Sequence, residues 1–220
     1  MRVLARVSGE LLLTAGAVVV LFGAYQLLWT NVGAGAAQRE LTGEMRRSWG
    51  DASTSEQARL PAAGEGLALL HIPRLGQGWV RPVVQGVAPD DLARGVGHYA
   101  ETALPGEVGN FAVAGHRATH GEPLHHLDRL RTGDAVVVET PEAWFTYAVR
   151  AEPVVVASTA TGVLAPVPGE RLLTLTTCHP RWSSEKRMIV HAALVDERPR
   201  AAGSPPALAG ERPGIAPGGA

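Results

Sequence analysis

An uncharged segment near the N-terminus is the feature that most constrains how this chain can fold. From Leu11 to Gln38 no residue carries a charge, and the 19 residues from Leu11 to Trp29 are strongly apolar. As a helix rising about 1.5 Å per residue, that apolar stretch extends roughly 28 Å, close to the hydrocarbon thickness of a bilayer. Tyr25 and Trp29 lie near one end, where aromatic rings favour the membrane interface. We expect a single transmembrane anchor over residues 11–30.

Two other interpretations of this segment stay open. Ala34-Gly35-Ala36 resembles the small-residue site at which a signal peptide is cleaved. The apolar part of a signal peptide usually has about 7–15 residues, however, and the stretch here is longer. A helix buried in a soluble core would need a polar face, and none is visible.

The arginines that flank the segment do not determine its orientation, because they lie on both sides of it: Arg2, Arg6, Arg39, Arg46 and Arg47. The short leader of residues 1–10 favours a cytoplasmic N-terminus, with the remainder of the chain exported. The expected location is therefore the cell membrane, with one span and an extracytoplasmic folded domain.

Composition divides the rest of the chain into three parts. Residues 31–66 are polar and rich in Ala, Ser and Glu, which predicts a stalk that is helical in part or disordered. Residues 197–220 combine proline with Gly and Ala, which is typical of a disordered tail. The folded domain is expected over residues 67–196. The formal net charge of −1 gives no basic field to attract nucleic acid.

Short apolar runs separated by turn residues fill the expected domain. Eight of these runs have the length and β-branched content of strands: Leu67–Ile72, Val83–Val84, Phe111–Ala114, Ala135–Glu139, Trp144–Val149, Val154–Ala157, Leu172–Thr177 and Met188–Val195. Two short helices are expected, over Pro89–Arg94 and Leu124–Leu130. Closely spaced strands with Gly and Pro between them favour a β-barrel or a β-sandwich.

Cys178 is the only cysteine of the chain. It can be an inert core residue, an intermolecular disulfide partner or a reactive thiol. A thiol becomes a strong nucleophile when it loses its proton, which a nearby cation or imidazole promotes. Cys178 follows the expected strand Leu172–Thr177, Arg187 precedes the next strand, and His116 follows Phe111–Ala114. If these strand ends meet, the three side chains can act as nucleophile, oxyanion donor and general acid–base.

Three blocks of sequence resemble the sortase family, and within it the class E sortases. The blocks are Gly97-His98-Tyr99 with Leu104–Asn110, Ala114-Gly115-His116-Arg117, and Thr174–Pro180 with Ser183, Arg187, Ile189 and Val190. The resemblance covers about Leu67 to Val195. It implies a mainly β fold, an eight-stranded sortase-type β-barrel with short helices that is preceded by an N-terminal transmembrane helix.

The same resemblance implies a cysteine transpeptidase. Sortases cleave a Leu-Pro-x-Thr-Gly sorting signal between Thr and Gly and hold the substrate as a thioacyl enzyme. An amine, usually that of a peptidoglycan precursor, then releases it. By this resemblance Cys178, His116 and Arg187 are the catalytic residues. Tyr99 is a substrate-binding residue, because a tyrosine at the matching position has been linked to the class E preference for Leu-Ala-x-Thr-Gly. Thr177 is expected to line the substrate groove.

No cofactor and no metal ion is expected. His120, His125 and His126 cluster after the second block, but their spacing fits no zinc pattern. The expected partners are surface proteins that carry the sorting signal, a peptidoglycan-precursor amine and the membrane, without nucleic acid. Two alternatives stay open: a pilin polymerase, in which a substrate lysine releases the thioacyl enzyme, and a non-catalytic membrane-tethered barrel that only binds partners.

Overall fold

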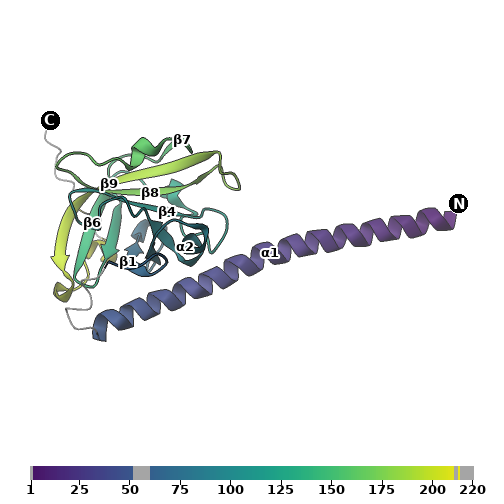
Figure 1. Ribbon diagram of the computed structural model, residues 1–220, viewed down its shortest axis with the longest axis horizontal. Helices are drawn as coiled ribbons and strands as arrows, with labels where there is room; N and C mark the ends of the chain where they lie inside the picture. Colours follow the sequence, from purple (N-terminus) through teal and green to yellow (C-terminus); the bar gives the residue numbers. More distant parts are fainter. Residues whose placement is uncertain (1, 52–59, 211–212, 214–220) are drawn as a thin grey trace.

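A long N-terminal helix and a β-barrel make up the fold (Figure 1). The computed structural model describes residues 2–51, 60–210 and 213. Helix α1 spans Arg2–Asp51 without interruption. In Figure 1 its C-terminal half runs beside the barrel, and its N-terminal half projects away from the barrel as a free rod.

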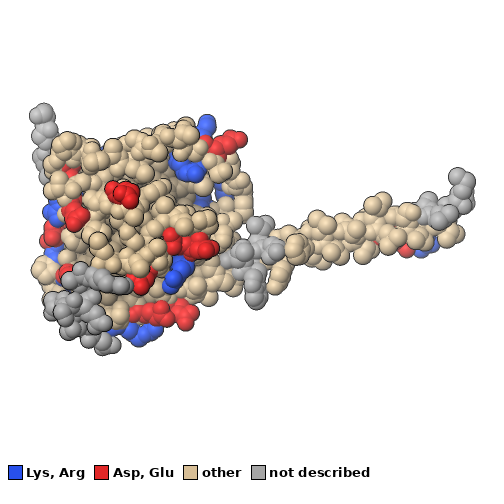
Figure 2. Space-filling view, in the orientation of Figure 1, with Lys and Arg blue, Asp and Glu red and all other residues tan. Residues whose placement is uncertain are grey.

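The projecting half of α1 has the length and composition of a membrane span. Within the described residues, Arg6–Tyr25 is the one helical segment long and apolar enough to cross a bilayer, and none of it is buried. Figure 2 shows this part of the helix almost wholly in tan, with its charged residues gathered near the N-terminal end. Large apolar side chains such as Leu13, Val19 and Leu21 are exposed along it. Such a continuous apolar surface is expected to lie in lipid rather than in water.

Within residues 60–210, nine strands form one continuous sheet. They are β1 (Gly66–His71), β2 (Val80–Gln85), β3 (Val96–His98), β4 (Gly109–Gly115), β5 (Ala135–Glu139), β6 (Ala143–Val149), β7 (Val154–Ala157), β8 (Arg171–His179) and β9 (Lys186–Pro199). Their order is β6-β5-β1-β2-β3-β4-β8-β9-β7, and β6 also pairs with β9. This last pairing closes eight strands into a barrel and leaves β7 outside the ring, attached to β9.

The length of β9 makes both pairings possible. Residues 186–189 of β9 pair with β7, and residues 192–199 pair with β6. Along its other edge, residues 186–193 of β9 pair antiparallel with β8. Two other strand pairs of the barrel, β2–β3 and β4–β8, are parallel. Closure leaves the eight ring strands without a free edge, which removes a common route to aggregation.

The barrel interior is the hydrophobic core. Phe111, Tyr147, Leu173, Leu175 and Val190 belong to one cluster of buried side chains, and each is at most 1% exposed. Their alternate spacing along β4 and β8 follows the period of two by which a strand directs successive side chains to opposite faces. Odd-numbered residues of these two strands therefore face inward, and even-numbered residues face the outer surface.

The expected eight-stranded barrel is confirmed, although its strands are not all the expected ones. β3 was not expected, because a three-residue strand containing glycine has no readable alternation. The run Val154–Ala157 does form a strand, β7, but it lies outside the ring.

Of the two expected helices, α2 forms over Pro89–Arg94. Residues 124–130 form only the 3-10 turn η2, over Leu127–Arg129. Leu124, Leu127 and Leu130 are all fully buried at a spacing of three, which matches the 3-10 repeat rather than the α-helical one.

The segments on either side of the barrel are more ordered than the sequence suggests. α1 continues to Asp51, so residues 31–51 of the expected stalk are helical, while residues 52–59 lie outside the described residues. In the expected disordered tail, β9 extends to Pro199 and the 3-10 turns η4 (Arg200–Ala202) and η5 (Pro206–Ala209) follow. Ala207 and Leu208 pack against Trp144 on the outside of the barrel, which explains the order. Residues 211–212 and 214–220 lie outside the described residues.

The loops between the strands include two further 3-10 turns and a tight turn at Gly106. The turn η1 (Pro73–Leu75) lies between β1 and β2, and the turn η3 (Thr161–Leu164) lies between β7 and β8. The turn at Gly106 lies over β6: its backbone N–H donates to the Tyr147 hydroxyl at 2.8 Å. Gly106 has φ +82°, and a Cβ there would enter the ring of Phe145.

We predict that Gly106→Ala is far more damaging than Gly169→Ala. Both glycines have a left-handed φ, +82° and +77°, but no atom lies within 4 Å of a Cβ at Gly169. Gly169→Ala should lower the free energy of unfolding by about 1 kcal/mol through backbone strain alone. Gly106→Ala adds the clash with Phe145 and should cost at least about 3 kcal/mol. Denaturant unfolding of the full chain in neutral detergent measures the difference, and equal losses would contradict the close packing at Gly106.

Candidate active site

The β8–β9 hairpin brings Cys178 next to Arg187. Cys178 is paired directly with Arg187, and His179 with Lys186, at the end of the hairpin that residues 180–185 connect. Directly opposed residues of an antiparallel pair project to the same face with their Cβ atoms about 5 Å apart. Leu173 and Leu175 face the core, so Cys178 and Arg187 lie on the outer face. Both residues are half-buried there.

The parallel β4–β8 pair brings His116 to the same place. The register aligns Ala114 with Thr176 and Gly115 with Thr177. The next residue after Gly115 is His116, and the next residue after Thr177 is Cys178. In the parallel register these two residues are therefore neighbours at one end of the barrel. The thiol and the guanidinium of one hairpin thus meet, at one rim of the barrel, the imidazole of a residue 62 positions earlier in the chain.

His116 is partly buried and lies next to a second histidine. Its ring stacks on that of His120 with centroids 4.5 Å apart, and its Nδ1 is 3.5 Å from the Thr119 hydroxyl. Burial lowers the pKa of His116, and the positive charge of His120 lowers that pKa further. A protonated His116 is consequently a stronger acid than an ordinary histidine.

The loop that begins at His116 is held by helix α1. Gln38 donates from Nε2 to the carbonyl of His120 at 2.9 Å, and Asn31 accepts from the Gly121 N–H at 3.2 Å. His120 and Glu122 both have left-handed backbone conformations, with φ +53° and +48°. Side chains rarely adopt this region without support from their surroundings. The contacts with α1 are that support, and they couple the helix to the loop of His116.

The guanidinium of Arg187 uses only part of its hydrogen-bonding capacity within the described part of the chain. Its Nη1 donates to the backbone carbonyls of Ser184, at 2.8 Å, and Lys186, at 3.1 Å. Within the described part of the chain, the guanidinium makes no ion pair, and its Nε and Nη2 make no hydrogen bond. The group is fixed by the hairpin backbone and keeps N–H donors for a negatively charged oxygen near Cys178.

Tyr99 lies over the outer face of β8, whereas Thr177 does not. The Tyr99 hydroxyl is 3.3 Å from that of Thr176, which is two residues before Cys178 on the same face. Thr177 points the other way: it is 2% exposed, and its hydroxyl donates to the Gly115 carbonyl at 2.7 Å. This burial gives no support to the expected contact of Thr177 with substrate. Its hydrogen bond instead ties β8 to the end of β4, directly beside Cys178.

A cavity of about 650 Å³ opens on the outer face near Tyr99. One wall is the segment that follows β3, and the other is the η3 turn between β7 and β8. Its lining residues are Gly86, Val87, Tyr99, Ala100, Glu101, Thr102, Thr161, Gly162, Leu164 and Ala165. Asn110 holds the η3 wall by donating to the carbonyls of Val163 and Ala165, at 3.4 and 3.5 Å. Tyr99 links the cavity to the strand of Cys178, because it lines the cavity and contacts Thr176, two residues before Cys178.

The sequence did not predict that the η3 turn and Thr176 belong to the surroundings of the site. The segment Thr161–Leu164 has no periodic pattern and no charge that would single it out. Thr176 could have been found, because it shares the outer face with Cys178 in a strand whose inward positions are the leucines. Among the described residues, no three His, Cys, Asp or Glu side chains converge as metal ligands would.

The sequence profile of the sortase domain matches residues 70–195, which is most of the barrel and all of the strand ends described above. This chain belongs to the sortase family. Sortase SrtE2 of Streptomyces coelicolor is 34% identical over 86% of this chain and 81% of the relative. Sortase SrtE1 of the same organism is 42% identical over 94% of this chain. The alignment spans 61% of the length of Sortase SrtE1, so this sortase corresponds to about three fifths of that relative.

Solved structures agree with the family assignment. Sortase E from Streptomyces avermitilis superposes with a TM-score of 0.62 at 44% identity and covers 67% of this sortase and 99% of the solved chain. Sortase E1 from Streptomyces coelicolor, solved with a tripeptide in the active site, gives a TM-score of 0.61 at 43% identity and covers 68% and 99%. The resemblance to class E sortases is therefore confirmed in both sequence and fold.

We predict that His116 titrates below the usual histidine pKa of about 6.5, because its charged form is partly desolvated and faces His120. His120→Ala should raise the pKa of His116 toward the ordinary value without reaching it, since burial is the larger cause. NMR titration of histidine-labelled protein, with the His116 signal assigned by its loss in His116→Gln, measures both values. A pKa at or above 6.5 in the unsubstituted protein would contradict this picture of the site.

Proposed function

We propose that this sortase is a membrane-anchored transpeptidase that cleaves a Leu-Ala-x-Thr-Gly or Leu-Pro-x-Thr-Gly signal between Thr and Gly. The observation that carries the proposal is the shared rim position of Cys178, His116 and Arg187, on the barrel face where Tyr99 connects β8 to a cavity. A tripeptide occupies the active site of the similar Sortase E1, which supports a peptide as the ligand of this one.

In the first half of the reaction, the Cys178 thiolate attacks the threonine carbonyl carbon and a C–S bond forms. Arg187 donates hydrogen bonds to the oxyanion that develops on the carbonyl oxygen. Protonated His116 gives its proton to the glycine nitrogen as the C–N bond breaks. The glycine end leaves as a neutral amine, and the rest of the signal remains on Cys178 as a thioester.

In the second half, an amine attacks the thioester. Neutral His116 accepts a proton from the attacking nitrogen, the new C–N bond forms, and the C–S bond breaks to return Cys178 as thiolate. The lowered pKa of His116 favours the first half, because the protonated side chain releases its proton readily to the leaving amine. We propose a cell-wall precursor amine as the acceptor; a pilin lysine is the alternative acceptor for the same chemistry.

The anchor would hold this chemistry at the membrane surface. The exposed apolar segment Arg6–Tyr25 supports a single membrane span. We propose that residues 1–10 are cytoplasmic and that the barrel lies outside the membrane, where surface proteins and wall precursors meet. The substrates on this proposal are surface proteins that carry the sorting signal.

We predict that Cys178→Ala abolishes cleavage and thioester formation, and that Arg187→Ala lowers kcat/KM by about 10²–10³ through loss of an oxyanion donor. The matched control is Lys186→Ala, the neighbouring cation, whose exposed side chain points to the opposite face of β9. The control should retain full activity, and all three variants should keep the unfolding temperature of the parent.

The assay uses the full chain in neutral detergent with both signal peptides and a panel of amines, including a lysine peptide, and identifies products by mass. A Cys178→Ala protein that still cleaves would refute the mechanism. No cleavage by the parent protein, together with a Cys178 unreactive toward iodoacetamide, would favour the non-catalytic binding barrel.

We also predict a role for Tyr99 in choosing between Ala and Pro at the second position of the signal. The Tyr99 side chain lines the cavity, and its hydroxyl contacts Thr176. Tyr99→Phe removes that hydrogen bond and frees the ring, which should reduce the ratio of kcat/KM for the Ala and Pro peptides by about tenfold. An unchanged ratio, measured by competition between the two peptides, would exclude Tyr99 as a specificity residue.

A further inference from the structure

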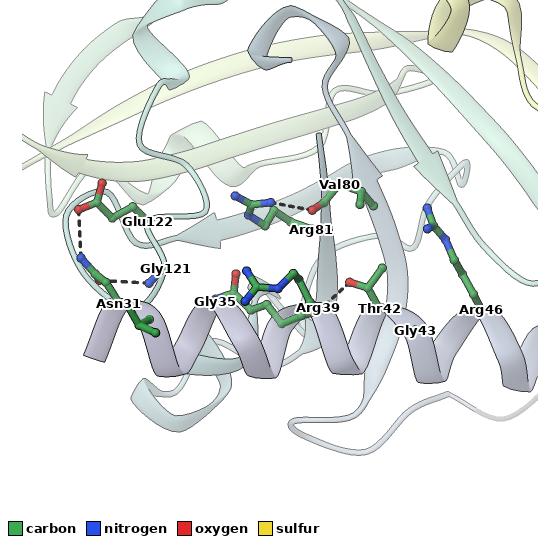
Figure 3. Close-up of a pocket in the computed structure, with 12 residues that line it drawn as sticks. Asn31, Gly35, Arg39, Thr42, Gly43, Arg46, Val80, Arg81, Gly121 and Glu122 are labelled. Carbon is green, nitrogen blue, oxygen red and sulfur yellow. Dashed lines mark hydrogen bonds between the residues drawn. The ribbon is translucent and has the colours of Figure 1, made fainter. Parts of the chain in front are cut away.

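A second cavity, of about 660 Å³, lies between the C-terminal half of α1 and the barrel (Figure 3). The helix forms one wall, and β2 and the loop after His116 form the other. The lining residues are Asn31, Val32, Gly35, Gln38, Arg39, Thr42, Gly43, Arg46, Val80, Arg81, Gly121 and Glu122. This cavity shares no lining residue with the cavity near Tyr99.

Three arginines supply the charge of this cavity. Arg39 and Arg46 come from α1, and Arg81 comes from β2. Figure 3 shows the side chains of Arg39 and Arg81 between the helix and the barrel, with Arg46 farther along the helix. The seven positions from Arg39 to Arg46 are about two helical turns. None of the three makes an ion pair with any acidic side chain in the part of the chain that is described.

Arg81 is the most constrained of the three. Its Nη1 donates to the carbonyl of Val80 at 2.8 Å, while its Nε is buried and has no hydrogen-bond partner among the described residues. Burial lowers the pKa of Arg81, and the charge of Arg39 lowers it further. A buried donor without a partner and two like charges across a cavity are both unfavourable unless an anion compensates them.

The acidic residue that lines the cavity is already engaged. Glu122 lies 2.7 Å from His125 Nδ1 and 3.2 Å from Arg181, and it accepts from Asn31 at 3.3 Å. These contacts direct its carboxylate charge toward the His116 loop and away from the three arginines. The cavity therefore keeps a positive excess with N–H donors on two sides.

The position of the cavity along α1 indicates where its ligand comes from. Arg39 is the first charged residue after the uncharged segment Leu11–Gln38. On the continuous helix it lies 14 residues after Tyr25, the end of the candidate span, which is about 21 Å along the axis and beyond the headgroup layer of an upright span. A free anion therefore reaches the cavity from solution, and a lipid headgroup reaches it where the helix tilts toward the membrane surface. In both cases the arginines supply chemistry suited to phosphate.

We propose that this cavity is a phosphate-binding site in which Arg39, Arg46 and Arg81 hold one phosphate group between the anchor helix and the barrel. The group is carried by an anionic phospholipid headgroup or is free inorganic phosphate; the guanidinium–phosphate chemistry is the same. Gly121 and Gln38 also line the cavity, so a bound phosphate lies beside the contacts that hold the His116 loop. The proposal does not depend on the transpeptidase activity.

The test titrates the full chain in dodecyl maltoside with inorganic phosphate and, separately, with dioleoylphosphatidylglycerol in the micelles. Dioleoylglycerol, which lacks phosphate, is the lipid control. The readout is the thermal unfolding midpoint, from which a dissociation constant follows because a ligand that binds only the folded state stabilises it. Arg39→Gln, Arg46→Gln and Arg81→Gln should each weaken binding about tenfold, as expected for loss of one charge-assisted contact.

Arg47→Gln is the matched control: it makes the same charge change on the same helix, but Arg47 does not line the cavity. It should alter binding less than about twofold. Saturable binding of inorganic phosphate alone would support a free-anion site, and binding of phosphatidylglycerol alone would support a headgroup site.

Absence of saturable binding by either probe would overturn the proposal. So would an effect of Arg47→Gln equal to that of Arg39→Gln, which would show diffuse charge attraction. If Arg81→Gln fails to fold, the exposed residues Arg39 and Arg46 decide the outcome alone.

Discussion

The register of β8 between its two neighbours is the constraint on which the rest of this site depends. β8 pairs in parallel with β4 and antiparallel with β9, so its position fixes the residues beside Cys178 on both sides. A slip of one residue would turn Cys178 inward and expose the leucines, because side chains alternate between faces. The packing of Leu173 and Leu175 in the core makes such a slip costly. The hydrogen bond from the Thr177 hydroxyl to the Gly115 carbonyl stabilises the same register at the end of the strands where Cys178 lies.

Helix α1 extends this constraint to the loop of His116. Gln38 and Asn31 bind the backbone of residues 120 and 121, more than 80 residues away in sequence. Met45 packs against Gly66 at the start of β1, where a side chain on the glycine would leave no room for the methionine. The helix that carries the apolar segment is thus continuous with the helix that holds the loop, and three arginines from α1 and β2 line the cavity between the helix and the barrel. On our proposals, the anchor both tethers the barrel and supports its active-site loop.

Local patterns in the sequence predicted the fold well where those patterns were strong. Alternating and β-branched runs located most strands, and the strand ends that carry Cys178 and Arg187 are the predicted ones. The same alternation, extended from Leu173 and Leu175, would have placed Thr177 inside the barrel. β3 and the η3 wall escaped prediction because each depends on pairing or hydrogen bonding with distant segments rather than on its own composition. The contact of α1 with the barrel was not predicted for the same reason. The polar residues of the helix have the composition of a solvent-exposed stalk, and their binding partner is a loop that is distant in sequence.

The measurement that most directly tests the meeting of these three strand ends is the pH dependence of Cys178 alkylation. Iodoacetamide reacts with the thiolate of the single cysteine, so the rate reports its ionisation without any assumption about substrate. If His116 lies beside Cys178, the charge of its imidazole changes the reactivity of the thiolate, so the profile should show an inflection at the pKa of His116. His116→Gln should remove this inflection, and His126→Gln should leave it. A profile that His116→Gln leaves unchanged would contradict the account.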